Sequence, residues 1–342
     1  MIRLSLLQFR VQAITAATAL AAFAILLAAT GPHLASLYAA SGISGCQPAS
    51  CGHLASNFLQ QLYSAGTYWL LYLLGVMLIL LAPAVIGLFW GAPLIARELE
   101  DGTSALAWNQ SITRTRWLAV KLTVGGLAAM AVTEALSLLQ AWWAAPIGRA
   151  AGYDIGSSDY LAMGRFSSLV FATHGITPLG YAAFGFTLGV TAGALIRRTV
   201  PAMAVTLAIF AFVQIAMPLW ICPNLFPARL TVIPVTSLNG SHFNLGALDL
   251  PGQPGAWVLS SGAVNAAGQA TSTTPAACTA PSMQGPSAAF FDCLASHGIR
   301  EAISYQPASR YWAFQWTETA IYLALALTLT GYCFRLLNRR LS

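Results

Sequence analysis

Long apolar stretches separated by shorter polar segments form the main pattern along this chain. Six of the stretches hold roughly 20 or more mostly apolar residues, the length that a helix needs to cross a bilayer. They lie at about 12–31, 69–95, 120–146, 166–196, 200–221 and 316–336. The first is too long for a signal peptide and no clear cleavage site follows it. The pattern therefore predicts an all-α integral membrane protein with six transmembrane helices.

The composition favours the same class of protein. Of the 342 residues, 57% are hydrophobic and 8% are charged, whereas about 25% are charged in an average soluble domain. The formal net charge is +6, which could indicate nucleic acid binding. However, the basic residues are spread among loop ends and form no basic-aromatic patch. Membrane topology explains them better, so no nucleic acid partner is expected.

Lys and Arg are unequally shared between the two sides that six spans create. The side with both termini would carry Arg3, Arg10, Arg97, Arg114, Arg116, Lys121, Arg197, Arg198, Arg335, Arg339 and Arg340. The opposite side would carry Arg149, Arg165, Arg229, Arg300 and Arg310. Basic residues favour the cytoplasmic side. We therefore expect a multi-pass protein of the plasma membrane with both termini in the cytoplasm.

Three segments would then be extracellular, at about 32–68, 147–165 and 222–315. The last is rich in Gly, Pro, Ser, Thr and Ala, a composition that favours turns and irregular structure. Its roughly ninety residues are too many for a simple connection. We expect this long segment between helices five and six to form a small extracellular cap.

Four cysteines lie in these outer segments: Cys46, Cys51, Cys278 and Cys293. Disulfides persist in oxidising compartments, so the pairs Cys46–Cys51 and Cys278–Cys293 are candidates. Pairings that involve Cys222 remain open, because connectivity cannot be deduced from a sequence. A zinc site at Cys46 and Cys51 would lack the usual second pair of sulfur ligands, and no metal site is expected.

Motifs for catalysis are lacking. No segment matches GxxxxGK[ST], the loop whose backbone amides bind nucleotide phosphates. There is also no HExxH and no GxSxG sequence, the signatures of zinc proteases and serine hydrolases. The chain is therefore not expected to be an enzyme or to hold a cofactor.

The segment between the second and third spans is a charged island, with seven charged residues between 97 and 121. Its candidate contact residues are Arg97, Glu98, Glu100, Asp101, Gly102, Thr103, Trp108, Thr113, Arg114 and Arg116. Gly102 and Thr103 predict a helix stop, and Thr103 or Ser104 can cap a second short helix. An amphipathic element with acidic and basic edges suits docking onto a soluble protein. An interfacial loop anchored by Arg and Trp is the alternative, and the residues alone favour neither.

Two stretches carry a family resemblance. The first reads GAPLIARELEDGT at 91–103, LAW at 106–108 and QSITR at 110–114, and continues with Trp117 and Lys121. The second reads YQPASRYW at 305–312 and QW at 315–316, before the last span. Both resemble ABC-2-type transporter permeases of an actinobacterial subgroup, and the six spans with cytoplasmic termini agree with this resemblance.

The resemblance implies the transmembrane permease subunit of an ATP-binding-cassette exporter that moves an amphipathic or hydrophobic substrate outward. Such permeases form homodimers or heterodimers and bind separate ATPase subunits, which hold ATP and Mg²⁺. The chain would comprise an interfacial amphipathic helix at 1–10, five spans within 11–221 with a coupling loop at 97–116, the cap at 222–315, and the last span with a cytoplasmic tail at 316–342. A non-transporting membrane sensor or adaptor, using the cap to recognise ligand, remains the alternative.

Polar residues inside the spans are candidates for function, because burying charge in lipid is costly. Glu134 is about 20 Å along the third span from Lys121, at 1.5 Å per residue. Gln140 lies roughly 120° around the helix from Glu134. Both are candidates for a transport pathway, and a structural hydrogen bond is the alternative for Glu134. Glu318 lies near the outer end of the last span, where we expect a solvated rim.

Glycines recur at four-residue spacing in the fourth span, at Gly185, Gly189 and Gly193. This spacing removes side chains from one helix face and allows a neighbouring helix to approach closely. Helix packing is therefore preferred over a substrate groove for these glycines.

Overall fold

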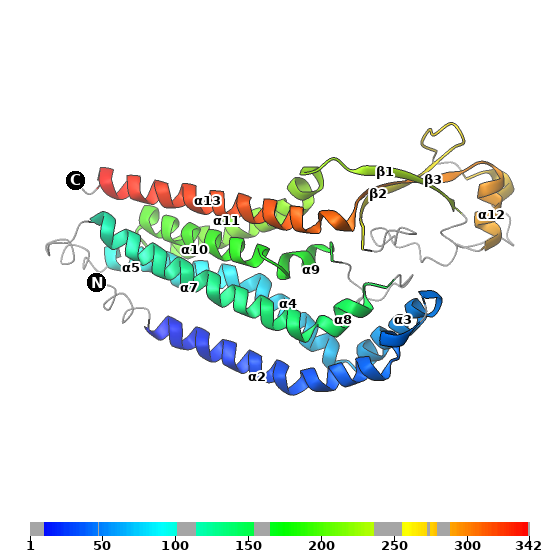
Figure 1. Ribbon diagram of the computed structural model, residues 1–342. Coiled ribbons are helices and arrows are strands. Elements are labelled where there is room, and N and C mark those ends of the chain that lie inside the picture. The colour runs from blue at the N-terminus through cyan, green and yellow to red at the C-terminus, as the bar shows by residue number, and fades with distance from the viewer. Residues whose placement is uncertain are drawn as a thin grey trace.

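The protein is a bundle of long helices with a small sheet at one end, as the computed structural model shows (Figure 1). The structure describes residues 10–46, 48–100, 114–153, 165–235, 255–271, 274–278 and 288–340. Two predicted features lie largely outside these ranges. They are the interfacial helix at 1–10, of which only Arg10 is described, and most of the coupling loop, between Glu100 and Arg114.

Six helices in the described residues are long and apolar enough to cross a membrane. They are α2 (Arg10–Ala40), α4 (Thr67–Ile86) continuing through η2 (Gly87–Gly91) into α5 (Ala92–Glu100), α7 (Arg114–Trp143), α10 (Thr177–Ile196), α11 (Thr199–Ala216) continuing through η3 (Met217–Ile221) into η4 (Cys222–Asn224), and α13 (Tyr311–Arg340). The six predicted spans are confirmed, although their ends differ. The fourth begins at Thr177 because Gly175, at φ 76°, separates it from the short helix α9 (Ser168–Thr173).

Helix α10 lies at the centre of the bundle. It packs against α13, α7, α5, η2, α11 and α4, and it is the most completely buried of the six spans. Its surroundings are protein on nearly every side, so small residues are suited to it. The outer helices instead expose apolar residues, such as Val200 and Phe212 of α11, as expected for helices in contact with lipid.

Two of the spans contain a π-helical turn. In η2, Gly87 and Gly91 lie at either end of the turn, and Pro83 one turn earlier has no backbone N–H to donate. In η3, Pro218 occupies the turn itself. Such turns interrupt the regular α-helical hydrogen bonding and often occur at functional sites.

Shorter helices cover the bundle at the end where α2 meets α4. They are η1 (Ile43–Gly45), α3 (Pro48–Ser64) and α8 (Ala145–Ala150). Phe58 and Leu62 of α3 share a buried core with Tyr38 of α2 and Trp143 of α7. The disulfide Cys46–Cys51 joins the region of η1 to α3.

A three-stranded antiparallel sheet lies between α11 and α13 in the sequence. Its strands are β1 (Arg229–Pro234), β2 (Trp257–Val264) and β3 (Arg300–Gln306), in the spatial order β1-β3-β2. Helix α12 (Ala288–Ser296) packs beside it through Phe291, which shares a small core with Val235 and Ile299. A second disulfide, Cys278–Cys293, joins η6 (Ala276–Cys278) to α12. We call β1, β2, β3, η6 and α12 the cap.

The sheet makes the prediction of an all-α fold wrong for the cap. Each strand is at most eight residues long, too short to stand out from the Gly-, Pro- and Ser-rich sequence around it. In β3, alternate residues are buried, as expected for a half-buried strand. Its two partners come from more than thirty residues away, so local composition could not reveal the pairing. The short 3-10 turn η8 (Ala308–Arg310) then leads from the sheet into α13.

Candidate functional site

Polar contacts connect the two helices between which the predicted coupling loop runs. Glu98 at the end of α5 accepts a hydrogen bond from the ammonium of Lys121 in α7, and the two form an ion pair. The Lys121 side chain is only 5% exposed, and its Nζ atom lies 4.4 Å from the centre of the Trp117 ring. The loop therefore begins and ends on helices that are tied to each other.

A third helix joins this group through Glu100, the last residue of α5. One carboxylate oxygen of Glu100 accepts hydrogen bonds from the backbone amide (3.3 Å) and the hydroxyl (2.6 Å) of Thr199, the first residue of α11. These two bonds, with help from the charges of Arg198 and Arg97, lower the pKa of Glu100. A carboxylate at a helix N-terminus is also favoured by the helix dipole.

These contacts change the interpretation of two predicted docking residues. Glu98 and Glu100 are engaged within the chain, whereas the side chains of Arg97 and Arg116 are exposed. The other predicted docking positions lie outside the described residues, as does the side chain of Arg114: they are Asp101, Gly102, Thr103, Trp108 and Thr113.

The polar residues predicted in the third span have separate environments. Gln140 is fully buried. Its amide nitrogen donates to the Tyr72 carbonyl at 3.4 Å, and its side chain fills the space where a Cβ on Gly75 would stand. Glu134 is half-buried, and one of its carboxylate oxygens has no hydrogen-bond partner among the described residues. Gln140 therefore packs α7 against α4, and among the described residues no hydrogen bond joins it to Glu134.

The glycines of α10 lie directly against the backbone of α4, η2 and α5. A Cβ on Gly185 would lie 2.6 Å from the carbonyl oxygen of Pro83. A Cβ on Gly189 would collide with the Gly87 carbonyl, and one on Gly193 with the Ala92 carbonyl. The contact is reciprocal, because a Cβ on Gly87 would lie 2.5 Å from the Gly185 carbonyl oxygen. These positions thus allow the close backbone approach that their spacing suggests.

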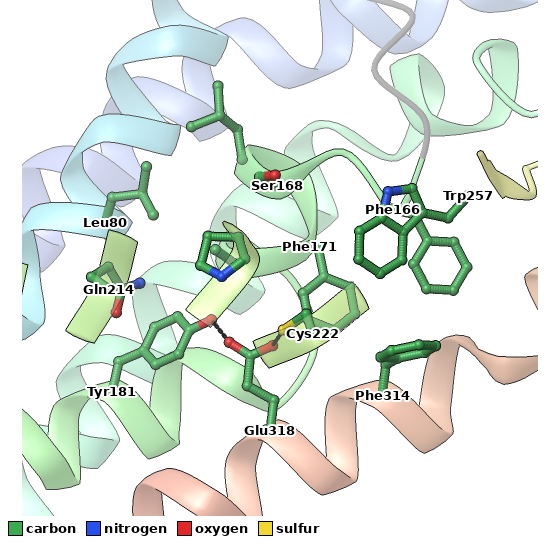
Figure 2. Close-up of a pocket in the computed structure, with 13 residues that line it drawn as sticks. Leu80, Phe166, Ser168, Phe171, Tyr181, Gln214, Cys222, Trp257, Phe314 and Glu318 are labelled. Carbon is green, nitrogen blue, oxygen red and sulfur yellow. Dashed lines mark hydrogen bonds between the residues drawn. The ribbon is translucent and has the colours of Figure 1, made fainter. Parts of the chain in front are cut away.

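A cavity of about 210 Å³ lies at the opposite end of α10, between the spans and the cap (Figure 2). Its lining comes from α4, α9, α10, α11, η3, η4, α13 and β2, and it is mostly apolar. The lining residues are Leu80, Phe166, Ser168, Leu169, Phe171, Ala172, Tyr181, Gln214, Pro218, Cys222, Trp257, Phe314 and Glu318.

Glu318 supplies the one carboxylate of this lining. It is 3% exposed. Its two oxygens accept hydrogen bonds from the Tyr181 hydroxyl at 2.6 Å and the Cys222 thiol at 3.2 Å, as Figure 2 shows. Among the described residues, no Lys, Arg or His forms an ion pair with it. The expectation of a solvated rim at Glu318 is therefore wrong, because α10 and η4 cover this face of α13.

Aromatic rings form the side of the cavity toward the cap. Phe166 stacks on Trp257 of β2, with ring centres 5.8 Å apart and an interplanar angle of 13°. Phe314 of α13 meets both rings edge to face. Phe171 of α9 also stacks on Phe166, with ring centres 6.1 Å apart. The cap thus contributes directly to the cavity through Trp257.

Gln315 holds these elements in place. It is fully buried, and its amide oxygen accepts from the backbone amides of Ile176 (3.0 Å) and Thr177 (3.2 Å). Its amide nitrogen donates to the carbonyls of Phe171 and His174, each at 3.1 Å. One side chain of α13 therefore satisfies backbone groups at the end of α9, which contributes Phe171 to the cavity, and in the turn that leads to α10. Burial lowers the pKa of His174 in this turn.

Sequence reasoning missed this cavity. The three side chains that hydrogen-bond to one another in it, Tyr181, Cys222 and Glu318, are separated by about forty and almost one hundred residues along the chain, and no motif links them. The one available signal was an acidic residue in an apolar span. Elsewhere in the described residues, Cys278, Cys293 and His297 cluster closely enough for a metal, but the disulfide engages both sulfur atoms.

Comparison with known proteins identifies the family. A family model described as "ABC-2 membrane transporter related" matches residues 17–222, more than half of the chain. The match takes in five of the six spans and ends at Cys222, beside the cavity. Among curated proteins and among solved structures, nothing matches this chain.

Proposed function

We propose that this chain is the transmembrane permease subunit of an ATP-binding-cassette exporter. The proposal starts from its family, because the chain belongs to the ABC-2 membrane transporter related family. The chain is a multi-pass component of a membrane transporter and is not itself the catalytic subunit. In the proposal, a separate ATPase subunit binds ATP and Mg²⁺. Two permease copies, identical or different, enclose the pathway, and an amphipathic or hydrophobic substrate leaves the cell.

The arrangement of the bundle supports the proposed orientation. Helix α2 begins, α5 ends and α13 ends at one end of the bundle, whereas the cap lies at the opposite end (Figure 1). If the basic-rich end is cytoplasmic, the loop between α5 and α7 faces the cytoplasm. The cap and its two disulfide-bonded cysteines then face an oxidising exterior.

The tie between the helices that flank the loop is the observation that carries the proposal. The ion pair Glu98–Lys121 joins α5 to α7, and the hydrogen bonds of Glu100 to Thr199 join α5 to α11. A subunit that pushes on the loop would therefore move three spans together. This is the property that a coupling segment needs when its energy comes from another protein.

The proposal can be tested by co-purification with the ATP-binding protein encoded beside this chain. Arg116 is exposed at the start of α7, so Arg116→Glu should weaken the complex and lower ATPase stimulation by about tenfold, the effect of roughly 1.4 kcal/mol. Arg229→Glu, the same change at an exposed position of the cap, is the matched control and should leave both unchanged.

Two outcomes would overturn the proposal. The first is an ATP-binding protein that neither co-purifies with the wild-type chain nor responds to it. The second is an Arg116→Glu variant that stimulates ATP hydrolysis as well as the wild type. In the second case the loop is an interfacial anchor, and a sensor or adaptor role gains support.

A further inference from the structure

We infer that the cavity beside Glu318 is a binding site for a small organic cation with an aromatic or bulky apolar body, such as an aryl-alkyl amine or quaternary ammonium compound. Binding at this site does not depend on export. Only the statement that the bound cation is the transported substrate rests on the proposed function.

The charge of the ligand follows from the environment of Glu318. A carboxylate removed from water is costly unless it is paired. Tyr181 and Cys222 each contribute a neutral donor to one of its oxygens, which favours the ionised carboxylate but supplies no positive charge to balance it. A positively charged ligand would neutralise it and would form a charge-assisted hydrogen bond or contact in a water-poor site.

The apolar body follows from the walls. Phe166, Phe171, Trp257 and Phe314 line the cavity together, and in Figure 2 they stand beyond Glu318 on the side of the cap. Aromatic rings attract cations through the negative potential of their faces, and Trp is the strongest of them. They also offer apolar surface to the rest of the ligand. Gln214 adds an amide on the side of the cavity away from Trp257, as Figure 2 shows.

The size of the cavity limits the ligand. Its volume of about 210 Å³ is below the range of roughly 300–1,000 Å³ that is usual for pockets of drug-sized ligands. A single ring with a small ammonium group suits this space, whereas a whole lipid does not.

Two other occupants suit the residues less well. A hard cation such as Ca²⁺ or Mg²⁺ takes six or more oxygen ligands, whereas only Glu318, Tyr181, Gln214 and Ser168 of this lining carry side-chain oxygens, and most of the other lining side chains are aromatic or aliphatic. A neutral apolar molecule, including a lipid chain, would fill the volume but would offer the Glu318 carboxylate neither a charge nor a hydrogen bond. The pairing of one carboxylate with several rings is therefore best matched by an organic cation.

The test uses the full-length permease in lipid nanodiscs without any ATPase. The probes are benzyltrimethylammonium and neopentylbenzene, which has nearly the same shape but no charge. The wild type should bind the cation more tightly than the neutral probe. Glu318→Gln, which keeps the size of the side chain, should weaken the affinity for the cation by at least about tenfold. It should change the affinity for the neutral probe by no more than about twofold.

Two further variants keep the result interpretable. Glu301→Gln makes the same change at a 5% exposed carboxylate of β3 that does not line the cavity, and it should bind the cation as the wild type does. Trp257→Leu should weaken binding of the cation more than binding of the neutral probe, because it removes an aromatic ring that attracts the positive charge. A monodisperse elution profile in size-exclusion chromatography establishes that each variant is folded.

The inference is overturned if the wild type binds neither probe, if it binds both equally well, or if Glu318→Gln binds the cation unchanged. None of these results touches the exporter proposal, which the ATPase experiment tests separately. Conversely, a cation that binds through Glu318 but is not exported by the assembled complex would overturn its role as substrate and leave the site intact.

Discussion

Replacing Gly189 by Ala should destabilise the bundle, although Ala is the better helix former. In α10, a Cβ on Gly189 would lie 2.8 Å from the backbone nitrogen of Ala92 and still closer to the carbonyl oxygen of Gly87. Both atoms belong to the backbone of another span, so neither can rotate away. The helices would have to separate by about 0.6 Å for the nitrogen contact alone to reach an ordinary 3.4 Å.

The magnitude follows from two opposing contributions. Ala stabilises a helix interior by about 1 kcal/mol relative to Gly. Overpacking a close contact costs about 1–3 kcal/mol, and the value here belongs at the upper end because backbone rather than side chain is displaced. Separation would also loosen the neighbouring contact of Gly185 with Pro83. The net loss should be about 1–2 kcal/mol of unfolding free energy.

Thermal unfolding of the purified permease in detergent provides the assay. Gly331→Ala in α13 is the matched control, because a Cβ there meets nothing within 4 Å. That variant should be as stable as the wild type or more stable, whereas Gly189→Ala should have a lower midpoint. Equal midpoints for the two variants would refute the close backbone contact between α10 and η2.

Two further predictions concern charged groups. Lys121→Met should lower the free energy of unfolding by about 3 kcal/mol or more, because it leaves the half-buried Glu98 carboxylate unpaired. The double variant with Glu98→Gln should recover most of that loss. A double-mutant cycle of thermal stability measures the coupling, and additive effects of the two changes would contradict the ion pair. Burial lowers the pKa of His174 below the ordinary 6.5. The folded state therefore binds fewer protons than the unfolded state below that pH, and stability should fall as pH decreases from 6.5 through the folded-state pKa. His174→Gln should flatten this part of the stability–pH curve, and an unchanged slope would contradict the assignment.

The six spans could be predicted because a helix that crosses lipid must be apolar whichever helices it packs against. Their ends were harder to predict. Helix α2 continues to Ala40 although Pro32 lies within it, and its apolar pattern alone did not reveal this. The fourth span begins late because Gly175 turns the chain, and Gln315 from the last span satisfies the amides that follow. That partner lies 139 residues away from Ile176.

Glu318 illustrates why the cavity could not be predicted. It stands two residues after Trp316, which is 64% exposed and typical of a membrane interface. Two residues along a helix correspond to roughly 200° of rotation. Trp316 therefore lies on the opposite face of α13, and its exposure gives no information about the surroundings of Glu318. What surrounds Glu318 comes from Tyr181 and Cys222 on other spans, and only the assembled bundle brings them together.

Helix α10 connects the two ends of the molecule at which function is proposed. Gly189 and Gly193 rest on the backbone of η2 and α5, next to the loop, and Tyr181 donates to Glu318 in the cavity. Tyr181 and Gly193 are about 18 Å apart along the helix, at 1.5 Å per residue. A contact between two backbones cannot adjust by changing a rotamer, so a displacement of α5 must either move α10 or open the contact. If α10 moves while α13 stays, the hydrogen bond that stabilises the Glu318 charge changes length. Under the proposed function, ATP-driven motion at the loop would therefore alter the affinity for a cation in the cavity through one rigid helix.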